Sequence, residues 1–174
     1  MEALIGLLED EKIASEDVRR IEVATYRIAA EHAATGWDDF ASAQLSFPFL
    51  IGLALKFRAI RLEHFSDEVR RDPWFATIAR KLDVKAPPDL DRLYPQLRPA
   101  RVTVTTPRGV FTRTADEALG SRIVPLDDAG LKAKFGDLVG PVLGAGKAAE
   151  LLDRIWSIAE VADVAPLIET MTTA

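Results

Sequence analysis

The stretch RVTVTTPRGVFTRTAD, Arg101–Asp116, decides the fold class because it predicts a β-hairpin. The runs RVTVTT and VFTRTAD alternate along the chain and are rich in β-branched residues, which is typical of half-buried strands. Between the runs, Pro107 suits the second position of a type I turn and Gly109 suits the last. We therefore expect two antiparallel strands joined by a tight turn.

Two other segments predict strands that extend this hairpin into a sheet. Arg19–Arg27 (RRIEVATYR) places Ile21, Val23 and Thr25 on one face and polar or small residues on the other. Lys81–Ala86 (KLDVKA) adds an edge strand, which the two prolines that follow would blunt. The expected fold class is α+β, with an antiparallel sheet of about four strands covered by helices.

Helical patterns surround these strands and continue after the hairpin. Asp72 suits a helix cap with Pro73 in the first helical position, and Asp127 and Asp163 suit caps further along. The expected helices are Ala3–Glu11, Asp72–Leu82, Pro125–Gly144, Gly146–Val161 and Asp163–Met171. Two stretches read as linkers, Lys85–Pro99 with its four prolines and Leu119–Asp128. The chain therefore predicts a helical C-terminal tail behind the sheet.

The most apolar stretch is LSFPFLIGLAL, Leu45–Leu55. With Ser46 as the cap, we expect a helix from Phe47 to about Arg58, and Pro48 falls in its first turn, where a missing N–H costs nothing. Apolar residues on every side of this helix predict burial all round, and Gly52 inside it predicts a close neighbour. The free N–H groups at its start could bind an anion, whereas on pattern alone an ordinary capped core helix is the commoner structure.

Composition excludes several classes of protein. The 174 residues carry 22 Lys and Arg against 27 Asp and Glu, a net charge of −5 that argues against nucleic-acid binding. No apolar run approaches the roughly 18 residues of a membrane span, and the N-terminus lacks a signal-peptide pattern. The chain has no Cys, which excludes disulfides and thiolate sites and fits a cytoplasmic protein.

The residues alone show no complete active site. His32 and His64 lie in separate segments without a ligand-spaced partner, so we expect no metal site. Gly144–Gly146 (GAG) lacks the spacing of a nucleotide loop. Lys134 stands at the edge of an apolar helix stripe, where it could pair with an anionic ligand or simply extend into solvent.

Several ordered motifs resemble the C-terminal half of the MmgE/PrpD family, which includes 2-methylcitrate dehydratase, cis-aconitate decarboxylase and iminodisuccinate epimerase. They are the Ser-apolar-Pro-aromatic helix start in AQLSFPFLIGLAL, the Asp-Pro helix start of DPWFATIARKL, the hairpin and the closing LLDRIWSIAEVADVAPLIETM. Their order and spacing carry the resemblance, which extends over essentially the whole chain.

The resemblance implies a two-part architecture. Residues 1–124 would form the α+β lid domain, and residues 125–174 would be helices that return to an all-helical N-terminal domain. The family needs no cofactor, commonly forms homodimers and handles small di- and tricarboxylates in the cleft between its domains. It implies that Ser46 and the helix start bind a small carboxylate ligand and that Phe49 shapes the pocket. Lys134, noted above from its place on the helix, is a further candidate contact for that ligand.

Two departures from the family pattern affect the expected activity. The helical half, with its His and Lys residues, is not in this sequence, so the chain reads as a C-terminal fragment, a split-gene subunit or a separate domain. Phe49 stands where the family often has a Tyr thought to face the substrate, so that hydroxyl is missing. Two hypotheses follow: the lid part of a lyase or isomerase whose base comes from the other half, or a non-catalytic dimerisation or partner-binding module.

Overall fold

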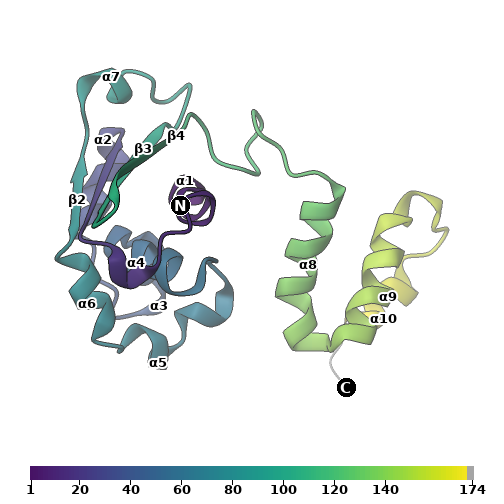
Figure 1. Cartoon of the computed structure of the whole chain (residues 1–174). Helices are drawn as coiled ribbons and strands as arrows, with labels where there is room; N and C mark the ends of the chain where they lie inside the picture. Colours follow the sequence, from purple (N-terminus) through teal and green to yellow (C-terminus); the bar gives the residue numbers. More distant parts are fainter. Residues whose placement is uncertain (172–174) are drawn as a thin grey trace. The chain divides into compact units, whose positions relative to one another are not determined.

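The computed structural model describes residues 1–171. The chain divides into two compact units, Met1–Val124 and Pro125–Ala174. The first unit holds a four-stranded sheet with its helices, and the second is helical (Figure 1). The boundary between the two units falls inside the stretch 119–128, which the sequence predicts to be a linker.

The sheet of the first unit has the strand order β2-β1-β3-β4. The predicted hairpin is confirmed, since β3 and β4 pair antiparallel from Ala100↔Ala115 to Thr106↔Gly109. Strand β1 pairs antiparallel with β3, and β2 lies at an edge, as expected. The strands are β1 (Arg20–Thr25), β2 (Leu82–Lys85), β3 (Ala100–Thr106) and β4 (Gly109–Ala115). The α+β fold class with four strands is confirmed.

The direction of β2 differs from the expectation of an antiparallel sheet. Strand β2 pairs parallel with β1, in the register Ile21↔Leu82 to Ala24↔Lys85, so the sheet is mixed. A parallel pair needs a long crossover, and the helical segment between β1 and β2 supplies it. Alternation in a sequence shows which side chains share a face but not the direction of a strand, so the pattern could not reveal this.

Seven helices of the first unit accompany the sheet. The predicted helices near residues 3–11, 47–58 and 72–82 are all present. Helix α6 is shorter than expected because the chain leaves it at Arg80 to enter β2. The helices are α1 (Glu2–Asp10), α2 (Arg27–Ala30), α3 (Phe40–Leu45), α4 (Phe47–Phe57), α5 (Asp67–Arg70), α6 (Trp74–Ala79) and α7 (Pro88–Asp91).

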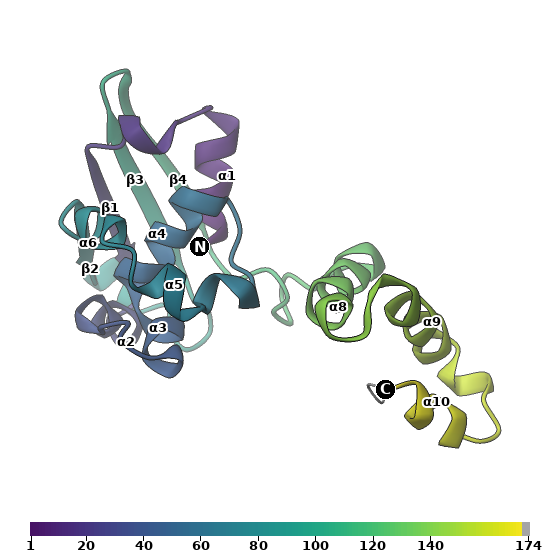
Figure 2. The same ribbon diagram turned by 90° about the horizontal axis from the view of Figure 1, so that it is seen from below.

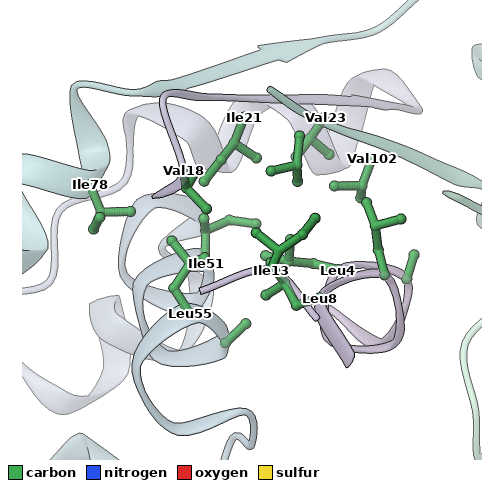
Figure 3. Close-up of a cluster of buried hydrophobic side chains, with 14 residues drawn as sticks. Leu4, Leu8, Ile13, Val18, Ile21, Val23, Ile51, Leu55, Ile78 and Val102 are labelled. Atoms are coloured by element: carbon green, nitrogen blue, oxygen red, sulfur yellow. The ribbon is translucent and has the colours of Figure 1, made fainter. Parts of the chain in front are cut away.

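The main core lies between the sheet and helices α1 and α4, which cover one of its faces (Figure 2). Ile21 and Val23 of β1 point into this core together with Val102 of β3 (Figure 3). Leu4 and Leu8 of α1, with Ile51 and Leu55 of α4, meet them from the helical side (Figure 3). The buried positions of β1 are the alternate ones that the sequence predicted.

The side chains of β1 and β2 that alternate with the core-facing ones are mostly charged. Arg20 pairs with Glu22 at 3.1 Å and with Asp83 at 2.9 Å, and Lys85 pairs with Asp83 at 2.9 Å. These groups are partly exposed, and such pairs add little stability. They also place charge along the β2 edge, which disfavours pairing with another chain.

The proline-rich stretch 85–99 is not a linker, which corrects the interpretation from the sequence. It contains α7, and Leu90 is buried. The Asp91 carboxylate accepts a hydrogen bond from the Arg27 N–H at 2.8 Å, and Thr25 donates its hydroxyl to the Pro99 carbonyl at 2.8 Å. These bonds attach the stretch to the end of β1, so it belongs to the first unit.

The second unit consists of α8 (Asp128–Leu143), α9 (Ala145–Trp156), a short 3-10 segment (Ile158–Glu160) and α10 (Ala165–Thr170). The Asp127 carboxylate caps α8 by accepting a hydrogen bond from the Gly130 N–H at 2.7 Å, as predicted. Helix α9 ends at Trp156, five residues before the predicted Val161. Apolar side chains of α8 stay exposed, since Leu138 and Val142 retain 46% and 65% of their surface.

Candidate functional site

Ser46 connects α3 to α4 and has no exposed surface. Its hydroxyl donates to the Thr35 carbonyl at 2.7 Å and accepts from the Phe49 N–H at 3.4 Å. The predicted cap of α4 is therefore confirmed, and the same hydroxyl also holds the loop around residue 35. Both hydrogen-bonding roles of the hydroxyl are used within the chain itself.

Phe49 is completely buried, and its ring is the centre of a cluster of aromatic side chains. The ring centroids of Trp37, Phe65 and Phe75 lie 6.2, 5.8 and 4.7 Å from that of Phe49. The sequence pattern did not identify this aromatic cluster, because its members come from four separate segments of the chain. The one signal in the sequence was the pair of adjacent aromatic residues, Trp74 and Phe75, that follows the Asp-Pro pair.

The start of α4 offers less to an anion than the sequence suggested. Pro48 has no N–H, Phe49 donates to Ser46, and Leu50 donates to the Ser46 carbonyl at 2.9 Å. Among residues 1–171, the N–H of Phe47 is the first-turn amide without an acceptor. One amide and the positive end of the helix dipole therefore remain for a ligand.

Gly52 has the close neighbour that its place in the helix predicted. A Cβ atom built on Gly52 would lie 2.4 Å from Cδ1 and 2.9 Å from Cε1 of Phe75. Real Cβ atoms do not approach other atoms so closely. Glycine at this position lets the Phe75 ring pack directly on the α4 backbone, next to Phe49.

A lysine and an aspartate border the aromatic cluster. The sequence pattern singled out Asp72 only as a helix cap and did not single out Lys56. The Lys56 ammonium lies 5.6 Å from the ring centroids of both Trp74 and Phe75 and pairs with the Asp72 carboxylate. The hydrogen bond from Lys56, together with that from the Trp74 N–H, lowers the pKa of Asp72. The Asp72 carboxylate accepts from the Trp74 N–H at 2.8 Å, but the N-cap residue of α6 is Pro73, one position later than the sequence predicted. The Lys56–Asp72 pair therefore reads as structural.

The two histidines do not form a site. His64 is buried and stacks on Phe57 with centroids 4.2 Å apart, and its Nδ1 accepts from the Arg61 N–H at 3.2 Å. Burial lowers the pKa of His64, which favours the neutral ring. His32 contacts the Thr35 hydroxyl at 3.4 Å. In the part of the chain that is described, no group of His, Asp and Glu could hold a metal ion.

Lys134 lies on α8 in the second unit, where its side chain is exposed. Ser46 and Phe49 belong to the first unit and are close to each other through the α4 cap. The assignment of Lys134 as a ligand contact therefore stays a prediction. Across residues 1–171, no helix is both long enough and apolar enough to cross a membrane.

A comparison with models of protein families matches residues 1–158 to the MmgE/PrpD C-terminal domain. The chain belongs to the MmgE/PrpD family. The matched region includes the whole first unit, α8 and α9. No curated protein matched the chain. In this MmgE/PrpD domain, Ser46, Phe49 and Lys134 all fall within the match, and the roles given to them remain predictions.

Proposed function

We propose that this chain is the lid part of a cofactor-independent MmgE/PrpD lyase or isomerase acting on small di- or tricarboxylates such as 2-methylcitrate or cis-aconitate. The family match over residues 1–158 is the observation that carries the proposal. The substrate class comes from the resemblance of the sequence motifs to that family. We expect a homo-oligomer, as in the family.

In this proposal the start of α4 lies near the substrate. The Phe47 N–H and the positive end of the helix attract a carboxylate. Ser46 acts as a positioning residue, because its bond to Thr35 fixes the loop beside the helix start. Phe49 and its aromatic neighbours form the floor of the site, and Lys134 contributes a positive charge. The base that removes the proton comes from the helical half.

An uncovered apolar groove of about 350 Å³ in the second unit supports the proposal that a helical partner binds there. The groove lies between α8, α9 and the end of α10. It is lined by Phe135, Leu138, Val139, Val142, Leu143, Leu151, Ile155 and Met171. Complete burial of an exposed Leu or Val contributes roughly 1.5–3 kcal/mol, and Leu138 and Val142 retain much of their surface in this groove. We propose that the all-helical MmgE/PrpD half, if it is encoded separately, covers this groove.

Reconstitution tests the proposal. The chain is mixed with a separately expressed helical half of an MmgE/PrpD enzyme, and consumption of 2-methylcitrate and of cis-aconitate is followed. We expect no turnover by the chain alone and measurable turnover by the complex. Turnover by the homogeneous chain alone, or a stable complex that is inactive on both acids, would contradict the proposal.

Ser46→Ala in the complex tests the site itself. We expect kcat/KM to fall about tenfold, because the loop and the helix start lose the hydroxyl that joins them. Ser66→Ala is the matched control, since Ser66 caps the short helix α5 in the same way. Equal effects of the two substitutions on kcat/KM would remove Ser46 from the site.

A second candidate function is a non-catalytic dimerisation or partner-binding module derived from the lid. The complete burial of Ser46 and Phe49 favours it, because neither side chain presents an atom to a ligand in this chain. The absence of a Tyr hydroxyl at position 49 also favours this second candidate. This candidate predicts that Ser46→Ala lowers the melting temperature of the complex and leaves tricarboxylate affinity unchanged.

A further inference from the structure

A polar pocket of about 270 Å³ lies in the first unit, and neither Ser46 nor Phe49 lines it. Two segments form it: residues 95–98, just before β3, and residues 117–123, just after β4. They meet because the start of β3 pairs with the end of β4 at Ala100↔Ala115. The lining residues are Pro95, Gln96, Arg98, Glu117, Ser121, Arg122 and Ile123.

Glu117 provides a buried carboxylate in this pocket, since its side chain is only 3% exposed. Its Oε1 accepts a hydrogen bond from the Ala118 N–H at 3.0 Å. Its Oε2 has Arg98 Nη1 at 3.9 Å, which is beyond hydrogen-bond distance. A carboxylate can accept about four hydrogen bonds, so Oε2 retains capacity for a donor that enters the pocket.

Two guanidinium groups provide the donors. Within the described residues 1–171, neither Arg98 nor Arg122 makes a hydrogen bond, and the Arg98 side chain is 53% exposed. Each guanidinium has five N–H donors in a planar arrangement that suits the oxygens of carboxylates and phosphates. The pocket thus presents unused donors beside one buried acceptor.

The walls of the pocket are fixed by hydrogen bonds within the chain. The Gly120 N–H donates to the Val124 carbonyl at 2.7 Å, and the Val124 N–H donates to the Ser121 hydroxyl at 3.1 Å. The Leu119 N–H donates to the Glu2 carboxylate at 3.0 Å, in a smaller hollow that also shares Arg98 and Glu117. The two arginines are therefore matched by two carboxylates, and recognition here depends on hydrogen bonding more than on net charge.

We propose that this pocket binds a small oxyanion that carries its own hydroxyl group. The oxyanion oxygens accept hydrogen bonds from Arg98 and Arg122, and the hydroxyl donates to Oε2 of Glu117. An anion without an O–H places an oxygen against the buried carboxylate and is disfavoured by repulsion and by the missing hydrogen bond. Hydrogen phosphate and 2-hydroxycarboxylates share the required pattern, whereas sulfate and simple carboxylates lack it.

This proposal does not depend on the proposed function, because the pocket shares no residue with the Ser46 helix start and is complete in the chain itself. The test uses the full 174-residue chain and isothermal titration calorimetry at constant ionic strength. Inorganic phosphate is compared with sulfate, and glycolate is compared with acetate. Phosphate species near neutral pH carry at least one P–OH group, so each pair differs by a hydroxyl donor.

We expect at least one hydroxyl-bearing anion to bind about tenfold or more tightly than its partner without the hydroxyl. The phosphate and glycolate arms distinguish a phosphate-type ligand from a hydroxycarboxylate. Arg98→Gln and Arg122→Gln should weaken that binding about tenfold each. Glu117→Gln should remove the preference, because the amide can donate to an unprotonated oxygen.

Arg101→Gln is the matched control, since Arg101 is an exposed arginine on β3 outside the pocket, and it should leave binding unchanged. Melting curves verify the fold of every variant. Should Glu117→Gln fail to fold, the proposal is still tested by Arg122→Gln, whose side chain is exposed, and by the comparison of phosphate with sulfate and of glycolate with acetate. Equal binding of both members of each pair, no binding of any of them, or binding unaffected by Arg98→Gln and Arg122→Gln would overturn the proposal.

Discussion

At the residue scale, the contact between Gly52 and Phe75 makes α4 sensitive to a single methyl group. In Gly52→Ala the new Cβ would overlap the Phe75 ring, which is completely buried. The better helix propensity of alanine contributes about 1 kcal/mol, whereas overpacking a core costs roughly 1–3 kcal/mol. We expect a net loss of stability of up to about 2 kcal/mol in urea unfolding.

Gly136→Ala provides the control for this substitution. Gly136 lies inside α8, and a Cβ atom there would meet nothing within 4 Å. Helix propensity then acts alone, and stability should rise by up to about 1 kcal/mol. Equal effects of the two substitutions would show that the Phe75 contact is unimportant.

His64 provides a second test at this scale, because burial lowers its pKa below the ordinary value of 6.5 in the folded chain. The unfolded chain then binds more protons as the pH falls below about 6.5. The free energy of unfolding should therefore fall from that pH down through the pKa of the folded state. Urea unfolding at several pH values between about 7.5 and 5 measures this slope.

His64→Phe removes the titrating group and keeps a ring stacked on Phe57. Its unfolding free energy should fall less steeply over the same pH range than that of the parent chain. The Arg61 N–H loses its acceptor in this variant, a cost that is the same at every pH and does not alter the slope. His32→Gln is the control, and an unchanged slope in His64→Phe would refute the argument.

At the element scale, the helices after residue 125 leave large apolar side chains exposed. Leu138 and Val142 remain exposed, while Ala148, Leu151 and Leu167 are buried. We expect the purified chain to self-associate through the 350 Å³ groove between α8, α9 and α10, or to have these helices frayed. Sedimentation velocity over a concentration series and amide exchange across α9 measure the two outcomes.

Leu138→Ser combined with Val142→Ser should weaken self-association, because both side chains line the groove. Leu62→Ser is the control, since Leu62 is equally exposed, at 57%, and lies in the first unit. A monomer at every concentration with slow exchange throughout α9 would contradict this expectation.

The elements also show what a sequence pattern can determine. Alternation located β1, β3 and β4, and for β1 it also placed the buried Ile21, Val23 and Thr25 on one face. It could not give the direction of β2, which depends on where the crossover helices bring the chain back. The proline-rich stretch resembled a linker because the sequence does not show the bonds to Asp91 and Pro99 that attach it to the sheet end.

At the scale of the whole molecule, the candidate site was harder to predict than the fold. The cap at Ser46 and the close neighbour of Gly52 followed from local rules of helix geometry. The aromatic neighbours of Phe49 and the bond from Ser46 to Thr35 depend on tertiary packing, which no local pattern encodes. The pocket at Arg98 and Glu117 is formed by segments on either side of the hairpin. In the sequence these two segments read as separate loops, so the pocket could not be recognised there.

The mixed sheet also has a consequence for the order in which this unit folds. The β3–β4 hairpin closes a turn of two residues, whereas β1 must find β2 about 60 positions later and β3 about 80 positions later. Closing loops of that length costs chain entropy before any contact rewards it. We therefore expect the hairpin to form early and β1 to be inserted between β2 and β3 last, in the step that limits the rate. Until then β2 and β3 each have an unpaired edge, so the nascent chain is most prone to aggregate in the interval before β1 arrives.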